Sequence, residues 1–390
     1  MADTPFDIKD VLKFAQKKIN EADTTTHSQD IIYLMKVAIR GDGNPIHMYD
    51  STGELPYLLD DIEDPEQIAY VRDQQNLYFS NNRYWKPLLK DTLATIFQGK
   101  SYGFTAGGGP ISTDQIERYS FSSDINSIDV DNLVVGLNHL AGHSDTSNDD
   151  GYVSGGSNPA TPAVNSDAIQ KYSFTSSGSA STTGTLTETK NKVSGVSDVV
   201  GAEGYTIGGT LSANSIEKFS FAASNSGADA GDLNGTSEYG ASSSDTTGSR
   251  GFVEYGSTID RFPFSSFTTA TNIGSLSSSP LIEGTGNSSK THGYVSGGVS
   301  PLGSDDVYKY PYSHSSGQVS AIGNLNTNRL LSGSTGASSE QHGYDVGGNT
   351  SPSAGSTTTS IEKYSFQTDL TGIDVADLVS AKHGTAGAQY

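Results

Sequence analysis

The chain offers few residues whose type and spacing suit chemistry. The closest such pair is His139 and His143, four positions apart in the phrase NHLAGH. On a helix, this spacing places two imidazoles on one face, as in zinc sites. The surrounding residues predict strand and turn instead, and no third ligand stands nearby. We therefore expect both histidines to be structural, and we expect the chain to hold no metal and no cofactor.

Two other histidines, His292 and His342, occupy one position of a repeat, directly before a Gly-Tyr pair. We expect them to form hydrogen bonds at strand ends rather than to catalyse a reaction. Two acidic phrases, SDTSNDDG at Ser144–Gly151 and DAGDLNG at Asp229–Gly235, resemble calcium loops. Both lack the alternating acids and the distal glutamate of such loops, and Asp and Asn commonly cap turns. We expect turn capping, with calcium binding as the open alternative.

The sequence lacks several classes of catalytic site. It contains no phosphate-binding GxxxxGK(S/T) loop and no HExxH zinc motif. It has no cysteine, which excludes disulfides, thiolate metal sites and cysteine nucleophiles. Paired carboxylates for glycoside cleavage stay open as an alternative, because a folded repeat brings distant acids together, but no signal in the sequence selects a pair. We expect a protein that is not an enzyme.

The formal net charge is −21, from 23 basic and 44 acidic residues. Binding to nucleic-acid phosphates needs clustered Lys and Arg, and anionic membranes repel acidic surfaces, so we expect neither partner. The N-terminus lacks the basic start and apolar stretch of a signal peptide, and no apolar run is long enough to span a bilayer. Hydrophobic residues make up only 33%, yet there are 45 Gly, 20 Tyr and 14 Phe, which indicates thin sheets joined by tight turns.

Residues 1–45 predict two short amphipathic helices. Ile8, Val11 and Leu12 follow helical spacing after a capping Thr-Pro, and Leu34 lies on the apolar face of the second helix. Such short helices need a partner to cover their apolar faces. We expect them to dock to another protein or to form oligomers with sister chains.

Residues 46–100 predict a small β-meander, in which IAYV, LYFS and RYWKPLL form three strands separated by turns. The single tryptophan, Trp85, lies in the third strand. It either forms the core of this meander or joins Tyr78 and Tyr84 in an aromatic docking patch, since aromatic residues are enriched at interfaces.

From residue 101 the sequence becomes a repeat of about 48 residues, a length typical of a propeller blade. Six copies of a Gly-aromatic phrase, most of which end in Gly-Gly, start at Gly103, Gly151, Gly204, Gly251, Gly293 and Gly343. A second phrase with an aromatic near its end follows each copy, as in IEKFSF at Ile216–Phe221. A Leu-containing phrase and a small Gly/Ser-rich phrase complete the unit. Four strand-like pieces per unit predict a mainly β fold, a six-bladed β-propeller over residues 101–390.

The last small phrase, GTAGAQY, is the C-terminus of this sequence. If it forms the innermost strand of a blade, it must return to the first unit and pair with YGFTAGG. Ring closure of this kind removes exposed sheet edges. The alternative inner strand is TLATIFQGK at Thr92–Lys100, which is less like the Gly/Ser-rich phrase. We also expect the Ile and the aromatics of the second phrase to pack between blades, and we expect Gly-Gly to turn the chain.

This strand order resembles the kelch repeat, although every unit lacks the tryptophan that follows the third kelch strand. A closer resemblance is to repeats in proteins of marine and cyanobacterial tailed phages, carried here by Ile361–Tyr390 and by ASSEQHGYDVGG at Ala337–Gly348. Residues 63–88 also resemble a small module near the N-termini of phage fibre and appendage proteins. The resemblance implies a virion component, a tail fibre or similar appendage, assembled in the host cytoplasm. It implies an N-terminal region that docks to other tail or capsid proteins, and a propeller that is displayed.

Function is then expected where the blades differ, because the shared residues build the shared fold. The longest variable loops, Ser157–Asp167 and Asn349–Ser360, are rich in Ser, Thr and Asn and suit polar glycans. The candidate ligand residues in these loops are Asn158, Asn165, Asp167 and Asn349. We expect a host-surface glycan or receptor as partner. A decoration protein without receptor activity and a polysaccharide-degrading appendage are the alternatives.

Overall fold

The computed structural model divides the chain into two compact units, Met1–Leu93 and Ala94–Tyr390. In the first unit it describes residues 47–49, 68–71, 76–80 and 85–87. In the second it describes residues 97–390 except for 111–112, 159–163, 211–213, 222–224, 246–248, 266–268, 278–281, 300–302, 331–335, 352–355 and 369. The described residues include no helix that is long and apolar enough to cross a membrane. The predicted N-terminal helices lie outside the described residues, and so do Ile8, Val11, Leu12, Leu34 and Tyr84.

The N-terminal unit contains a four-stranded sheet in the order β1-β2-β3-β4. The three predicted strands are present and antiparallel, as β2 (Ile68–Val71), β3 (Asn76–Ser80) and β4 (Trp85–Pro87). A strand that was not predicted, β1 (His47–Tyr49), pairs in parallel with β2. Within the sheet, Tyr78 pairs with Pro87, and Trp85 pairs with Ser80.

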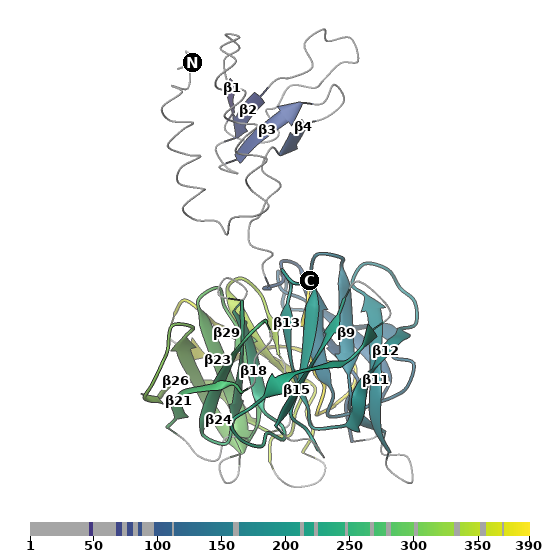
Figure 1. The fold of residues 1–390 in the computed structure, drawn as a ribbon, viewed down its shortest axis with the longest axis vertical. Coiled ribbons are helices and arrows are strands. Elements are labelled where there is room, and N and C mark those ends of the chain that lie inside the picture. The colour runs from purple at the N-terminus through teal and green to yellow at the C-terminus, as the bar shows by residue number, and fades with distance from the viewer. Residues whose placement is uncertain are drawn as a thin grey trace. The chain divides into compact units, whose positions relative to one another are not determined.

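The C-terminal unit is a six-bladed β-propeller, and the four main strands of each blade pair antiparallel (Figure 1). We number the blades along the chain and name their strands from the axis outward. Blade 1 contains β32 (Ala386–Gln389), β5 (Tyr102–Ala106), β6 (Gln115–Ser120) and β7 (Ile128–Asn132). Blade 2 contains β8 (Ala141–Asp145), β9 (Asp150–Ser154), β11 (Val164–Ser173) and β12 (Ser181–Lys190). Blade 3 contains β13 (Ser194–Asp198), β14 (Glu203–Ile207), β15 (Ser215–Ser220) and β17 (Ala228–Asp232).

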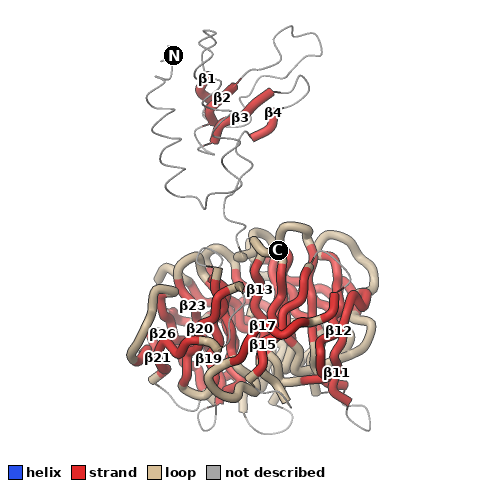
Figure 2. Tube along the Cα trace, viewed as in Figure 1, coloured by secondary structure: helices blue, strands red, loops and turns tan. Residues whose placement is uncertain are grey.

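The remaining blades have the same order. Blade 4 contains β18 (Ala241–Asp245), β19 (Arg250–Tyr255), β20 (Thr258–Pro263) and β21 (Thr271–Leu276). Blade 5 contains β22 (Ile282–Ser288), β23 (His292–Val299), β24 (Ser304–Pro311) and β26 (Ala321–Arg329). Blade 6 contains β27 (Ala337–Ser338), β28 (His342–Val346), β29 (Ser360–Ser365) and β31 (Ile373–Asp377). The short strands β16 (Asn225–Ser226), β25 (Gln318–Val319) and β30 (Leu370–Thr371) add in parallel to the outer strands of blades 2, 4 and 5, and β10 (Ser157–Asn158) pairs with β11. Figure 2 shows strands and loops, and no helix, in the described part of this unit.

The ring closes through the C-terminus, as the sequence predicts. Strand β32 pairs antiparallel with β5, and Ala386 lies opposite Ala106 while Gln389 lies opposite Gly103. The six innermost strands contact one another in a closed circle, because β32 touches both β8 of blade 2 and β27 of blade 6. Strand β32 thus occupies the inner position of blade 1, for which Thr92–Lys100 was the alternative.

The core consists of one aromatic cluster at each blade interface. The aromatic of each Gly-aromatic phrase packs against the two aromatics of the next blade's third strand; Tyr152, for example, lies 6.0 Å from Phe219 and 4.7 Å from Phe221 between ring centroids. Tyr344 makes the same contacts with Tyr119 and Phe121 across the closure. These contacts confirm the prediction that the aromatics pack between blades, and such pairs stabilise the interface beyond their buried area.

The recurring glycines have two separate causes. The first glycine of each phrase lies under an aromatic ring of the neighbouring strand, and a Cβ on Gly204 would collide with Phe219. The Gly-Gly pair turns the chain in the left-handed region, with φ of 63° at Gly208 and 92° at Gly209. Side chains rarely adopt this conformation, which confirms the turning role predicted from the sequence.

Candidate functional site

In the folded propeller, the side chain at the acidic position of the IEKFSF-type phrase forms hydrogen bonds between blades. In five blades, an oxygen of this side chain accepts the backbone N–H of the residue after the buried leucine of the preceding blade. The donor and acceptor residues are Val379 and Glu117, Val134 and Gln170, Thr187 and Glu217, Asn234 and Asp260, and Asn326 and Glu362. All five acceptors are buried. The recurring acid is therefore an interblade hydrogen-bond acceptor.

At three interfaces a buried cation pairs with this acid. Lys190, four residues after Leu186, lies 2.5 Å from Glu217, and both side chains are at most 3% exposed. The pairs Arg329–Glu362 and Lys382–Glu117 repeat this geometry, each at 2.7 Å. A buried charge needs a partner because its desolvation is costly. The interface between blades 1 and 2 has neutral Gln170 as the acceptor, and there the cation position is occupied by Leu137.

A ring of six buried hydrogen bonds closes the propeller axis. In each innermost strand, a backbone N–H donates to a side-chain oxygen of the next strand. The donors and acceptors run from Ser144 to Ser197, Ser244, Ser288, Ser338, Gln389 and back to Ser144, at 2.9–3.3 Å. Two residues earlier the strands touch through their backbones, since a Cβ on Gly142 would collide with the carbonyl oxygen of Gly387. We call the six residues that form these hydrogen bonds the inner ring: Ser144, Ser197, Ser244, Ser288, Ser338 and Gln389. The propeller axis is packed at this level.

The chain enters the propeller at one end of this axis. Phe97, Gln98 and Gly99 are buried, and Gln98 Nε2 donates to the carbonyl of Ser288 at 2.8 Å. Gly99 N donates to the carbonyl of Ser338 at 2.8 Å. These contacts lie at the ends of the innermost strands that lead to the turns into the second strands. The opposite face carries the Gly-Gly loops and the connections between blades.

On that opposite face, the connections between blades form a second ring around the axis. His139, Lys192, Tyr239, Glu283 and Gly384 occupy equivalent positions, two residues before the small residue of each innermost strand. Each described pair of neighbours is joined by a backbone hydrogen bond: Glu283 N to Tyr239 O, Tyr239 N to Lys192 O, Lys192 N to His139 O, and His139 N to Gly384 O, at 2.7–3.0 Å. We call these five residues the axial collar. The sixth equivalent, Gly333, lies outside the described residues.

The collar residues all have left-handed backbone conformations. Their φ values are 53° at His139, 58° at Lys192, 58° at Tyr239, 67° at Glu283 and 61° at Gly384. A residue with a Cβ pays roughly 1–2 kcal/mol in this region, and glycine does not. Gly384, which precedes the innermost strand of blade 1, is a glycine, so the fold accepts glycine at this position. Four neighbouring connections nevertheless carry a His, a Lys, a Tyr and a Glu, and such strained positions are enriched at functional sites.

The collar side chains form one cluster with their neighbours. The His139 ring lies 5.0 Å from the Tyr239 ring, edge to face, and 5.9 Å from the His383 ring. Lys192 Nζ lies 5.0 Å from the Tyr239 ring centroid and 2.9 Å from a Glu238 carboxylate oxygen. All of these side chains except Glu238 are half-buried. The cluster therefore combines an aromatic surface with several hydrogen-bonding groups.

Burial sets the protonation states in this cluster. It lowers the pKa of His139 to about 4, with smaller contributions from His383 and Lys192. It raises the pKa of Tyr239 to about 12, with Glu283 and Glu238 adding to the effect. Burial also raises the pKa of Glu283, against the influence of Lys192. At neutral pH the imidazole of His139 and the phenol of Tyr239 are uncharged, and Lys192 is paired with Glu238.

The loop residues predicted as ligands lie on the collar face but in two separate blades. Asn158 and Asn165 belong to the β10–β11 hairpin of blade 2, and Asp167 lies at the register shift of β11. Asn165 Nδ2 donates to Thr210 Oγ1 at 3.1 Å, toward blade 3. Asn349 belongs to blade 6, where its Oδ1 accepts the Thr357 hydroxyl at 2.8 Å. The structure thus brings the first three together and leaves Asn349 apart.

The other histidines and acids of interest have structural contacts. His143 Nδ1 lies 3.1 Å from the carbonyl of Val196, so it carries the proton and donates, and Nε2 accepts from Ser154 Oγ at 2.9 Å. Ser289 N donates to the backbone carbonyl of His292 and Ser339 N donates to that of His342, each at 2.9 Å, at strand ends. The ring Nδ1 of His292 lies 2.8 Å from Thr291 Oγ1. The two carboxylate oxygens of Asp145 cap their own turn. No group of three potential metal ligands occurs among the residues that the structure describes.

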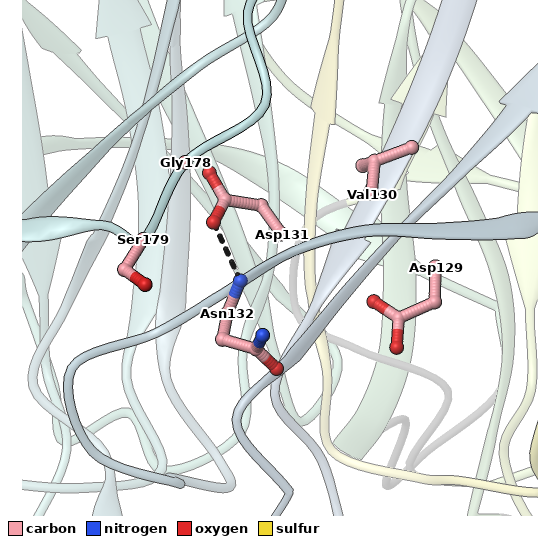
Figure 3. A pocket seen from close by; sticks show the side chains of 6 residues that line it. All are labelled: Asp129, Val130, Asp131, Asn132, Gly178 and Ser179. Atoms are coloured by element: carbon pink, nitrogen blue, oxygen red, sulfur yellow. Dashed lines mark hydrogen bonds between the residues drawn. The ribbon is translucent and has the colours of Figure 1, made fainter.

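An open recess of about 340 Å³ lies at the outer edge between blades 1 and 2 (Figure 3). It is lined by Asp129, Val130, Asp131, Asn132, Gly178 and Ser179. Asp131 is turned back on its own strand, where its carboxylate accepts the N–H of Asn132 at 2.7 Å. Burial raises the pKa of Asp131, the Asn132 hydrogen bond lowers it, and Asp129 raises it further. The recess lacks an aromatic surface and a charge partner, which makes the collar the better candidate site.

Sequence reasoning did not select the collar residues, although the repeat contained a signal for them. Aligning the units on their small Gly/Ser-rich phrase places His139, Lys192, Tyr239, Glu283, Gly333 and Gly384 in one column. Four positions of this column hold His, Lys, Tyr and Glu, and the other two hold glycine. No protein-family model and no curated protein matches the chain. The geometry of the residues themselves therefore carries the functional inference.

Proposed function

We propose that this chain is a structural and binding component of a tailed-phage virion, a kelch-like propeller within a tail fibre or related appendage. The N-terminal region docks to other tail or capsid proteins, in oligomeric form, and the propeller is displayed to bind a host-surface glycan without catalysis. The docking residues in this proposal are Ile8, Val11, Leu12, Leu34, Tyr78, Tyr84 and Trp85. Glycan binding is centred on the axial collar and extends to the loops that contain Asn158, Asn165, Asp167 and Asn349.

One observation carries the binding half of this proposal. His139, Lys192, Tyr239 and Glu283 are held at left-handed positions where the fold accepts glycine. The polar residues that recur in the repeat form hydrogen bonds between blades. They therefore account for the fold and do not indicate a ligand. The fold does not require the four collar side chains, and each raises the backbone energy at its position. Ligand binding is a reason for their presence.

The chemistry of the collar favours a neutral, polyhydroxylated ligand. The Tyr239 ring offers a flat apolar surface, and its hydroxyl and the neutral His139 imidazole offer donors and acceptors. Lys192 is already paired with Glu238 at 2.9 Å, and Glu283 is close, so the site holds no unpaired cation for an anion. A sugar ring presents both a C–H face and hydroxyls, and therefore matches this combination.

The pKa values of the collar side chains favour ligand binding over catalysis. A histidine with a pKa of about 4 is a weak general base at neutral pH. Tyr239, with a pKa of about 12, does not ionise near pH 7. The collar face is also the face opposite to residues 97–99, where the chain from the N-terminal unit enters the propeller.

A glycan array probed with the full chain tests this proposal, together with a host-adsorption assay. We expect binding to host-surface polysaccharides that falls by about tenfold or more in Tyr239→Gly, which corresponds to roughly 1.4 kcal/mol. Glycine is the residue that the fold already accepts at this position, so the variant keeps its fold. Tyr102→Ala, on the face where the chain enters, is the matched control and keeps full binding.

Three outcomes would count against the proposal. A propeller that binds no glycan and no host cell, while the N-terminal region still incorporates into particles, supports a decoration protein instead. Equal losses of glycan affinity in Tyr239→Gly and Tyr102→Ala would show that the binding site does not lie at the collar. Release of reducing ends from host polysaccharide indicates an enzyme.

A further inference from the structure

Each blade has two equivalent positions that lie diagonally across its second and third strands. One directly precedes the Gly-aromatic phrase, and the other is the Lys or Arg of the IEKFSF-type phrase. In blades 1 to 6 the pairs are Tyr102 and Arg118, Asp150 and Lys171, Glu203 and Lys218, Arg250 and Arg261, His292 and Lys309, and His342 and Lys363. Blade 4 is the one blade that has a guanidinium at both positions.

The strand register places Arg250 and Arg261 on the same face of blade 4. Phe252 lies opposite Arg261, and Arg250 lies two residues before Phe252. Alternate residues of a strand share a face, so both arginines are on the side of Phe252, which packs against Tyr310 and Tyr312 of blade 5. Diagonal neighbours on paired strands are within reach of long side chains. Both arginines are half-buried.

The preceding blades show that side chains at these two positions meet. In blade 2, Lys171 Nζ lies 2.5 Å from an Asp150 carboxylate oxygen. In blade 3, Lys218 Nζ lies 2.8 Å from a Glu203 carboxylate oxygen. Arg250 stands where these two blades have the acid. Two cations therefore occupy a place where the same repeat elsewhere builds an ion pair.

Neither arginine of blade 4 forms an ion pair with a residue that the structure describes. Asp245 lies opposite Arg250 in the innermost strand, but no ion pair joins the two. The equivalent of Asp245 in blade 2, Asp145, caps its own turn. The innermost strand thus supplies no carboxylate to the arginine pair.

The facing blade supplies no carboxylate either. At the interface of blades 6 and 1, Lys363 pairs with Asp124, which belongs to the loop after the third strand of the facing blade. The corresponding loop of blade 5 is residues 312–317, with the sequence YSHSSG. Its one titratable side chain besides Tyr312 is His314, which cannot supply a negative charge near pH 7. Both sources of an acid that other blades use are absent here.

The two guanidiniums repel each other in the free protein. Burial lowers the pKa of Arg261, and the nearby Arg250 lowers it further. Arginine nevertheless stays protonated near neutral pH, so the repulsion is not relieved by loss of a proton. An anion that binds both guanidiniums removes it. Two guanidiniums bring two positive charges and several N–H donors, and this combination matches a tetrahedral phosphate dianion better than a single carboxylate.

We propose that Arg250 and Arg261 bind a phosphate group, either as the free ion or as a monoester. Each guanidinium donates to phosphate oxygens, and the dianion takes the place of the acid that blades 2 and 3 have in the chain itself. Arg250 begins β19, directly after the turn that follows the innermost strand. The site therefore lies at the opposite end of the blades from the axial collar, and the proposal does not rest on glycan binding there.

Isothermal titration calorimetry with the full chain at low ionic strength tests the proposal. The titrants are inorganic phosphate, glucose 6-phosphate and acetate. Arg250→Gln and Arg261→Gln each remove one guanidinium, and Arg250→Glu introduces the acid that blade 3 has at this position. The matched control is Lys290→Gln, which removes an exposed cation from the equivalent turn of blade 5.

We expect inorganic phosphate to bind at least about tenfold more tightly than acetate, and to lose about tenfold in affinity in each Gln variant. Arg250→Glu should abolish the binding, and Lys290→Gln should keep the affinity of the wild type. Glucose 6-phosphate that binds as tightly as the free ion assigns the site to phosphate esters, and much weaker binding assigns it to the free ion.

A wild type that binds no phosphate overturns the proposal, and so does equal affinity of the wild type and Arg250→Gln. Equal losses in Lys290→Gln and Arg250→Gln overturn it too, because they indicate a general effect of charge. Thermal unfolding without phosphate checks that the variants are folded. It also gives a second readout, since Arg250→Glu should unfold at a higher temperature than the wild type, and phosphate should raise the midpoint of the wild type only.

Discussion

The backbone N–H of Gln389 donates to Ser144 Oγ at 3.0 Å, although the two residues are 245 positions apart. This bond completes the inner ring and joins the last strand of the chain to blade 2. The other five inner-ring bonds join residues 44–53 positions apart, whereas this one joins the first and the last innermost strands along the chain. It places the stability of the propeller under the control of the final residues.

Ser144→Ala should lower the thermal stability of the propeller. The substitution leaves the Gln389 N–H buried without an acceptor, which costs about 1–3 kcal/mol. We expect a fall of a few degrees in the unfolding midpoint, measured by calorimetry. Ser123→Ala, at an exposed loop position, is the control. Equal midpoints in both variants would show that the inner ring contributes nothing.

The buried pair Lys190–Glu217 should be replaceable by the neutral pair that the chain uses one interface earlier. Lys190→Leu alone leaves the Glu217 carboxylate buried without its cation, and it should destabilise the propeller by about 3–5 kcal/mol. The double variant Lys190→Leu, Glu217→Gln copies Leu137 and Gln170 and should recover most of that loss. Urea unfolding of both single variants and the double variant gives the coupling energy. An additive double variant contradicts the idea that each interface needs matched charges.

His143 should make the propeller sensitive to acid. Burial lowers its pKa from 6.5 to about 4, so the unfolded chain binds a proton first as the pH falls. The stability is complete above pH 6.5 and declines toward pH 4, by about 3 kcal/mol for this group. His143→Gln keeps a donor for Val196 and an acceptor for Ser154, and it should flatten this part of the pH profile. An unchanged slope between pH 4 and 6.5 would exclude His143 as the source.

Glu254 should act in the opposite direction. Burial raises its pKa from 4.5 to about 8, and its carboxyl accepts the Tyr310 hydroxyl at the interface of blades 4 and 5. The folded state holds the proton that the unfolded chain releases, so stability falls as the pH rises from 4.5 through 8. Glu254→Gln should remove this fall and exceed the wild type most clearly near pH 8. Glu340→Gln, on the exposed surface, should leave the profile unchanged.

Tyr239→Gly should separate stability from binding. Glycine relieves the left-handed strain but adds backbone freedom to the unfolded chain. We expect the two effects to offset each other, so that the free energy of unfolding stays within about 1 kcal/mol of the wild type. Denaturant unfolding measures this directly. A large destabilisation would mean that the Tyr239 ring serves the fold, and it would remove the central support for a collar ligand site.

Much of the propeller could be predicted from the sequence, because the patterns that indicate its strands and turns are local. Strand phrases such as IEKFSF recur with turn residues between them, and each blade needs the same strands in the same order. The return of GTAGAQY to the first unit followed from counting the phrases. The partners of Glu217 and Glu362 could not be foretold in this way. They lie on neighbouring blades, and a repeat period states that units stack without stating which residues meet.

The sequence by itself determined the number of blades, the closure by the C-terminal strand and the turning role of Gly208 and Gly209. These features depend on periodicity and on the conformations that glycine permits. Only the tertiary structure decided that Ser144 and Gln389 belong to one ring and that His139 and Tyr239 share a site. Both relations depend on the rotation between blades, which places side chains from distant segments around one axis.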